Sequence, residues 1–359
     1  MNRPLIDTPL QSVRSKPFAT VLLCIVAVVF GFFRANNLTA SGISTHMEAA
    51  DRAVANLNPL THPGLATTLA QWPETVRVGA VYPDWGYLWP HSSDAAEDAH
   101  WQPFHTTAAE YLHQTYGEPW NAHSERLFCF IAGMACHGAM DDAWHFGRTS
   151  FLNQAINRDL IGWDAGQAEM VVETLTDLFV QADHRPDYES EKWWIPADDL
   201  LAIHQLAGHN HIKRGGIIRG TTIQRVAFLV ENVAWIFTLD LATEQIPWSR
   251  DNYLTWWDGG LMNGAELSAT RLEELWDEYQ AIASARPNDG NSSAPIHDLH
   301  DDHVPTQLWA EAAARLLQKG AIQVPVTETA NGAVVLGRPV ILDGKALVAE
   351  IYKILSRSL

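Results

Sequence analysis

The 359-residue chain is poor in cysteine, and this absence limits the kinds of fold it can have. Its three cysteines are Cys24, Cys129 and Cys136. The last two fall in one predicted helix, where seven residues separate their Cα atoms by about 10 Å, beyond the reach of a disulfide. We therefore expect Cys129 and Cys136 to be buried thiols, and we exclude a disulfide-stabilised scaffold.

Basic side chains are also scarce. Lysine and arginine number 24 against 42 acidic residues, which gives a formal charge of −18. Nucleic-acid-binding proteins usually present a basic face, so this balance argues against nucleic acid as a partner. Only 18% of residues are charged and 47% are hydrophobic, with 15 tryptophans, so the chain has the composition of a folded protein with a large core.

Residues 1–40 are predicted to be a signal peptide or a signal anchor. Arg14 and Lys16 precede an apolar run from Phe18 to Phe33, and small residues lead to Ala40. These 16 residues fall short of the roughly 20 that span a bilayer comfortably. Cleavage after Ala40 would give a secreted or extracytoplasmic protein, whereas an uncleaved segment would anchor it to a membrane.

Hydrophobic periodicity predicts an all-α fold of many helices with a small C-terminal α/β appendage. We expect residues 41–285 to form the main domain, 286–305 a linker rich in Pro, Asp, Asn and Ser, and 306–359 the appendage. The predicted helices are 45–58, 64–71, 105–116, 122–146, 164–183, 197–207, 221–243 and 264–284, followed by 306–318 and 345–356. Residues 79–86 are expected to be a connection rich in Gly, Pro and Trp, and two short strands should lie around Gly332 and Gly337.

The predicted helix 122–146 carries the most informative pattern. His137, Asp141 and His145 follow at intervals of four residues, so they share one face of the helix. The two histidines are about 12 Å apart along the axis, too far to share one ion comfortably. We expect Asp141 to bridge two neighbouring metal ions, each with one of the histidines. Nitrogen and oxygen ligands without thiolate suit zinc.

Two other interpretations of this helix remain open. A buried histidine can form a hydrogen bond with a carboxylate one turn away and have only a structural role. Asp141 and Asp142 could also belong to a magnesium-binding motif of an isoprenoid-type enzyme, although the flanking histidines and the export signal argue against it.

Four ordered motifs extend the pattern beyond one helix. They are SGISTHMEAADRAVANL (41–57), GAVYPDWGYLW (79–89), HWQPF (100–104) and AGMACHGAMDDAWH (132–145). As a set they resemble the zinc-dependent phospholipase C family, and within it the catalytic domain of glycosylphosphatidylinositol-specific phospholipase D. Weaker similarity continues to about residue 263, so the resemblance covers some 240 residues and ends before the appendage.

The resemblance implies a centre of two to three zinc ions. It assigns Asp84, His100, His137 and Asp141 to the first ion, and His46, Asp141 and the amino-terminal group of Ser41 to another. The last assignment requires cleavage directly before Ser41. The resemblance also implies that Asp84 orients or deprotonates the attacking water.

The third zinc position departs from the family pattern. His145 matches one ligand, but Trp163 and Gln167 stand where the family has a histidine and an acid. Asp164, Glu169 or Glu173 could replace them, and the last two are one helical turn apart. Equally, Glu169 and Glu173 could be a solvated helix face, which we favour from the sequence alone.

The resemblance implies an enzyme that hydrolyses a phosphodiester in a phospholipid or a glycosylphosphatidylinositol at a membrane surface, with a metal-activated water attacking phosphorus. Aromatic residues near the ligands could line the mouth of the site or pack in the core: Trp85, Tyr87, Trp89 and Trp101. The alternatives are a secreted zinc-dependent single-strand nuclease of the same architecture and an inactive, membrane-tethered zinc-binding protein. The sequence does not distinguish C-type from D-type cleavage.

Overall fold

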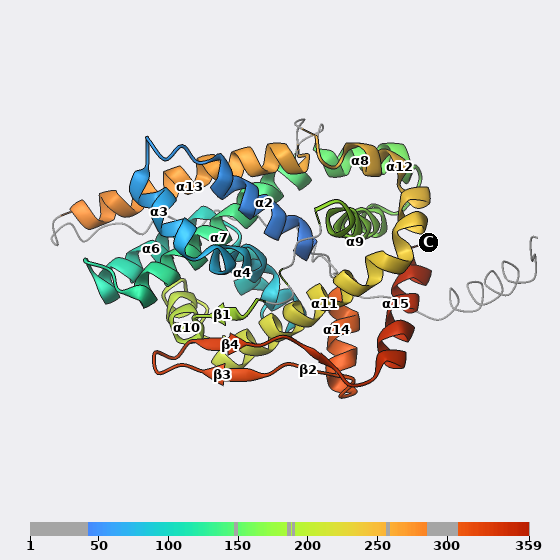
Figure 1. Ribbon diagram of the computed structural model, residues 1–359. Helices are drawn as coiled ribbons and strands as arrows, with labels where there is room; N and C mark the ends of the chain where they lie inside the picture. Colours follow the sequence, from blue (N-terminus) through green and yellow to red (C-terminus); the bar gives the residue numbers. More distant parts are fainter. Residues whose placement is uncertain are drawn as a thin grey trace, which may run out of the picture. The chain divides into compact units, whose positions relative to one another are not determined.

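The computed structural model describes residues 42–146, 150–184, 188, 191–255, 259–285 and 308–358. The predicted signal segment with Cys24, Ser41 and most of the predicted linker lie outside these residues, so the predictions made for them remain predictions. In the described part, helices dominate and the few strands are short, which confirms the all-α fold with a small C-terminal α/β element (Figure 1).

The helices of the main body have the following bounds: α2 Ile43–Asn56, α3 Pro63–Gln71, α4 Pro73–Val81, η1 (3-10) Tyr82–Leu88, α5 Ser93–Ala99, α6 Gln102–Tyr116, α7 Ala122–His145, α8 Phe151–Asp159, α9 Ala165–His184, α10 Ala197–Leu206, α11 Arg214–Gln245, α12 Pro247–Asn252 and α13 Leu261–Ser284.

Helix α7 is central to the body. It packs against α4, α13, α6 and α2, and nearly all of its middle is buried. Asn121 starts the helix with a capping box in which its side chain accepts hydrogen bonds from the backbone of His123 and Ser124. Cys129 and Cys136 lie in its buried part as free thiols, as predicted.

The segment around Gly79 differs from the prediction. Residues 79–86 were expected to be a connection, but Gly79 lies inside α4 and the following residues form the 3-10 helix η1. A Cβ on Gly79 would stand 2.2 Å from the carbonyl oxygen of Phe130 on α7, and one on Gly133 would stand 2.1 Å from that of Val76 on α4. Glycine is required here because two helix backbones touch.

The C-terminal segment contains α14 Leu308–Gln318, β2 Ile322–Gln323, β3 Val326–Glu328, β4 Val334–Leu336, β5 Val340–Ile341 and α15 Gly344–Ser358. Strand β4 pairs antiparallel with β3 and with β1 (Trp193–Ile195), with Trp194 opposite Val335. Figure 1 shows β3 and β4 beside α10 and α11, and α14 packs on α11. The segment is therefore attached to the main body, and Trp309 of α14 donates a hydrogen bond to the carbonyl oxygen of Thr174 on α9.

Helix α11 is the one helix among the described residues that is long and apolar enough to cross a membrane by length and composition. Half of its most apolar window is buried inside the protein, as in the core helix of a globular domain.

Candidate metal centre

Asp141 lies at the centre of a cluster of four histidines, of which all but His145 are buried. Its Oδ2 atom is 3.1 Å from Nε2 of His137 and 3.5 Å from Nε2 of His100. Its Oδ1 atom is 3.3 Å from Nε2 of His46 and 3.5 Å from Nε2 of His145. The two oxygens thus face different histidines, which is the arrangement of a carboxylate that bridges two ions.

Asp84, His100 and His137 form one group of donors beside Asp141. Oδ1 of Asp84 is 3.3 Å from Nε2 of His100 and 3.7 Å from Nε2 of His137, and their ligand atoms lie within 4.8 Å of one another. The other ring nitrogens are occupied, because Nδ1 of His100 lies 2.8 Å from the carbonyl oxygen of Ala96 and Nδ1 of His137 lies 2.7 Å from that of Ala80. Hydrogen bonds of this kind fix the ring orientation of metal-binding histidines and leave Nε2 as the ligand atom.

Close backbone packing holds His100 against α7. A Cβ on Gly138 would lie 1.9 Å from the carbonyl oxygen of His100, so only glycine allows this approach. His100 itself is the C-cap of α5, and Asp84 lies on η1. Three separate elements therefore supply the ligands of one group.

His46 supplies the second group with His137 and Asp141. It is 1% exposed, and its ring stacks on His137 with centroids 3.7 Å apart. Two parallel imidazoles at this distance would repel each other if both were protonated. Burial, followed by the charge of His137, lowers the pKa of His46.

A buried pair of carboxyl groups fixes the start of α2 just before His46. Asp177 accepts hydrogen bonds from the backbone and hydroxyl of Thr45, at 2.9 and 2.8 Å, and Ser44 donates to Glu231 at 2.6 Å. Burial raises the pKa of Asp177 to about 7 and that of Glu231 well above its usual range. These contacts orient the first turn of α2 and with it His46.

His145, Glu169 and Glu173 form the third group. Nδ1 of His145 is 3.0 Å from Glu169 and Nε2 is 3.4 Å from Glu173. Glu173 is only 3% exposed, so the favoured interpretation of this pair as a solvated helix face is wrong for Glu173. The sequence contained no signal for this burial, because Glu169, Glu173 and Asp177 recur every four residues on α9 and look like a polar helix face.

The other candidates for the third position lie elsewhere. Asp164 is exposed and accepts a hydrogen bond from the backbone of Gln167 at the start of α9. Trp163 is 37% exposed. Trp85, a candidate for the mouth of the site, is fully buried beside Tyr82, so it belongs to the core.

Trp101 and Phe146 are the aromatic residues that reach the surface next to the cluster. Their ring centroids are 6.0 Å apart, and they lie 5.9 Å from His100 and 6.4 Å from His145 respectively. Phe146 is 54% exposed. An exposed apolar surface formed by these two rings therefore lies next to the donor groups.

Several donor atoms of the cluster suit a bound cation. Within the described ranges, both ring nitrogens of His46, Nε2 of His137 and both carboxylate oxygens of Glu173 are buried without a well-formed hydrogen bond. An unpaired buried polar atom costs about 1–3 kcal/mol. Burial also raises the pKa of Glu173 well above its usual range. A divalent cation would offset both costs, so the residues fit a metal.

Comparison with known proteins shows which family this part of the chain resembles. Residues 45–194 match the zinc dependent phospholipase C family, and this span includes all the donors named above. Phosphatidylinositol-glycan-specific phospholipase D of Dictyostelium discoideum is 25% identical over 248 residues, which cover 67% of this chain and 25% of the relative. The proteins of the same name from Homo sapiens and Bos taurus are each 26% identical, covering 61% of this chain and 27% of the relative.

The chain thus spans about a quarter of the length of these curated relatives. No solved structure matches it. The matched span overlaps the four ordered motifs, and residues 45–194 of this chain are similar to the zinc dependent phospholipase C family and to phosphatidylinositol-glycan-specific phospholipase D.

Proposed function

We propose that this protein is a zinc-dependent phosphodiesterase that hydrolyses a phospholipid, with D-type cleavage of a glycosylphosphatidylinositol as the favoured reaction. The observation that carries the proposal is the position of Asp141, whose two oxygens face different histidines within a buried cluster of donors. The choice of reaction comes from the curated relatives, whose names specify phospholipase D and phosphatidylinositol-glycan.

The three donor groups would hold up to three zinc ions. Asp84, His100, His137 and Asp141 would bind the first. His46 and Asp141 would bind the second, with the amino group of Ser41 completing it if the chain is cleaved there. His145, Glu169 and Glu173 would bind the third. Bound zinc would supply a Lewis acid that neutralises phosphate oxygens and lowers the pKa of a coordinated water to about 7.

The protein's own residues would orient the reaction. Asp84 is 1% exposed and lies beside His100, so its carboxylate could accept a proton from an attacking water within a site that excludes bulk solvent. Trp101 and Phe146 would contact the lipid where the cluster reaches the surface. A half-exposed aromatic next to polar ligands suits a substrate that has an apolar and a charged part.

Activity on lipid vesicles tests this proposal. We expect the purified protein to release phosphorylated headgroup or phosphatidic acid from phospholipid or glycosylphosphatidylinositol vesicles, and a chelator to stop the reaction. Asp84→Asn should lower kcat by at least about 100-fold if the carboxylate acts as the base. Asp164→Asn, which changes an exposed carboxylate outside the donor groups, serves as the matched control.

The products decide among the remaining possibilities. Phosphatidic acid would identify D-type cleavage and diacylglycerol C-type cleavage. Hydrolysis of single-stranded DNA without hydrolysis of lipid would favour the nuclease, and zinc binding without turnover of any phosphodiester would contradict the enzyme.

A further inference from the structure

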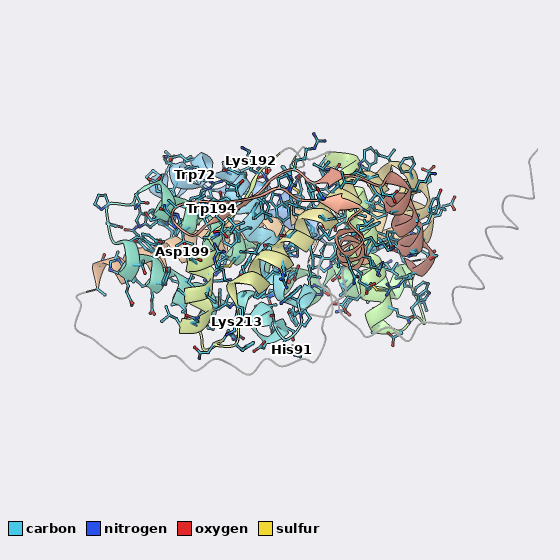
Figure 2. The ribbon with its side chains drawn as sticks, turned by 90° about the horizontal axis from the view of Figure 1, so that it is seen from below. Trp72, His91, Lys192, Trp194, Asp199 and Lys213 are labelled. Atoms are coloured by element: carbon cyan, nitrogen blue, oxygen red, sulfur yellow. The ribbon has the colours of Figure 1, made fainter. Side chains whose placement is uncertain are left out.

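A second cluster of metal-type ligands lies between α5 and the connection from α10 to α11. His209 and His211 are alternate residues in this connection, and Asp94 and Asp98 are one turn apart on α5. Figure 2 labels His91 and Lys213, which flank these two segments, at the same edge of the molecule. None of the four residues belongs to the groups around Asp141.

The backbone of the connection is held in a defined shape. Gly208 has a φ of +101°, which favours glycine, and the amide of His209 donates to the carbonyl oxygen of His204 at 2.8 Å. The amide of Ile212 then donates to the carbonyl oxygen of His209 at 3.2 Å. These bonds present both imidazole rings toward α5.

Three donor atoms converge on one point. Oδ2 of Asp94 is 3.3 Å from Nδ1 of His209, and its Oδ1 is 3.2 Å from Nε2 of His211. The ligand atoms of the three residues lie within 4.8 Å of one another. Two imidazole nitrogens and a carboxylate are a donor set typical of zinc.

Asp98 supports a metal site at this point through a contact that is separate from the three donor atoms. Its Oδ2 is 2.7 Å from Nε2 of His209, the ring nitrogen that faces away from Asp94. Metal-binding histidines commonly donate their second N–H to a carboxylate or carbonyl, which fixes the tautomer and ring orientation. His100 and His137 have the same arrangement with carbonyl partners.

We propose that Asp94, His209 and His211 form a second, separate zinc site and that Asp98 positions His209 within it. The side chains of Asp94 and His211 are 55% and 45% exposed, so water would complete the coordination and the ion would exchange with solvent. The site would join the start of α5 to the connection before α11. Because His100 is the C-cap of α5, a bound ion would brace the helix that leads directly to a ligand of the main centre.

Zinc titration of the full protein tests this proposal. Equilibrium dialysis against buffered free Zn²⁺ should show one more ion per chain for the wild type than for His211→Ala or Asp94→Ala. Asn210→Ala changes the exposed residue between the two histidines and should bind the wild-type number. Asp98→Asn should retain the site with an affinity lower by about 10- to 100-fold.

Loss of zinc from this second site can be distinguished from loss of zinc from the centre around Asp141. His211 is largely exposed, so its alanine variant should fold, which far-UV circular dichroism can verify. Loss of ions in Asp141→Asn should add to the loss in His211→Ala, because the two sites share no ligand. Equal zinc contents for the wild type, Asp94→Ala and His211→Ala would overturn the proposal and leave these residues as a surface ion-pair cluster.

Discussion

Asp141 shows how a single side chain can organise the centre. It is 6% exposed, and burial alone would raise its pKa. The neighbouring His137 and His46 outweigh this effect and lower the pKa of Asp141 well below its usual range. An ionised carboxylate among histidines is thus the stable state of this position, and an ionised carboxylate is the form that binds metal.

Glu173 gives a prediction at this scale. Glu173→Gln should reduce the zinc content by about one ion per chain, because an amide is a much weaker zinc ligand than a carboxylate. The buried amide is nearly isosteric, so the helix should remain folded. Metal analysis of the purified variant measures the change.

Asp164→Asn is the control for this experiment. Asp164 is an acidic residue of the same region that accepts a hydrogen bond at the start of α9 and lies outside the donor groups. It should keep the wild-type zinc content. An unchanged content in Glu173→Gln as well would exclude the third group as a zinc site.

At the scale of elements, the site depends on how closely α7 approaches its neighbours. Gly133 meets the backbone of α4, and Gly138 meets the backbone of His100. These contacts bring Asp84, His100 and His137 together from three elements. A side chain at either glycine would separate the elements and the ligands with them.

Gly138→Ala tests this dependence. Its Cβ would clash with the carbonyl oxygen of His100, and such overpacking costs about 1–3 kcal/mol, although alanine favours a helix by up to about 1 kcal/mol. We expect a lower free energy of unfolding and weaker zinc binding, measured by chemical denaturation and by zinc titration.

Gly215→Ala is the matched control, because a Cβ there meets no atom within 4 Å. Because Gly215 lies in α11, this variant should have a free energy of unfolding equal to that of the wild type or higher by up to about 1 kcal/mol, with unchanged zinc binding. If both glycine variants behave alike, the close approach at Gly138 is not what holds the site together.

The sequence predicted some elements better than others for physical reasons. The helix around His137 was predictable because its apolar residues recur at helical spacing and its ligands follow the same period. Helix α4 was missed because a glycine such as Gly79 usually weakens a helix. Gly79 is present because the backbone of α7 lies directly against it, which the sequence does not show. Glu173 was misjudged because its partner, His145, lies on another helix and no local pattern links them.

At the scale of the whole molecule, the C-terminal segment supports the main body. Strand β4 pairs with β1, and Trp309 is 2% exposed and donates to Thr174, the residue after Glu173. The division into a main domain, a linker and an appendage remains a prediction, because the segment between residues 285 and 308 lies outside the described residues.

Global stability should depend on pH through His105. Burial, followed by the charge of Arg271, lowers its pKa to about 3 from the ordinary 6.5. The unfolded chain therefore binds a proton that the folded protein excludes. The stabilisation is complete above pH 6.5 and is lost as the pH falls toward 3, with a slope of up to about 1.4 kcal/mol per pH unit.

Chemical denaturation at a series of pH values between about pH 5 and pH 6.5 can measure this slope. His105→Gln keeps a donor for the carbonyl oxygen of Ala99, with which Nε2 of His105 now interacts at 3.0 Å, but cannot be protonated. The free energy of unfolding of this variant should therefore change less with pH than that of the wild type, by up to about 1.4 kcal/mol per pH unit. Equal slopes for the wild type and His105→Gln would mean that His105 has the same pKa in the folded and the unfolded chain.

The measurement that tests the central claim most directly is the zinc content of the purified protein beside that of Asp141→Asn. Because Asp141 faces ligands on two sides, the variant should lose at least two ions per chain while its circular dichroism remains that of the wild type. A variant that folds and keeps the full wild-type zinc content would contradict the bridging role of Asp141 and the metal centre built on it.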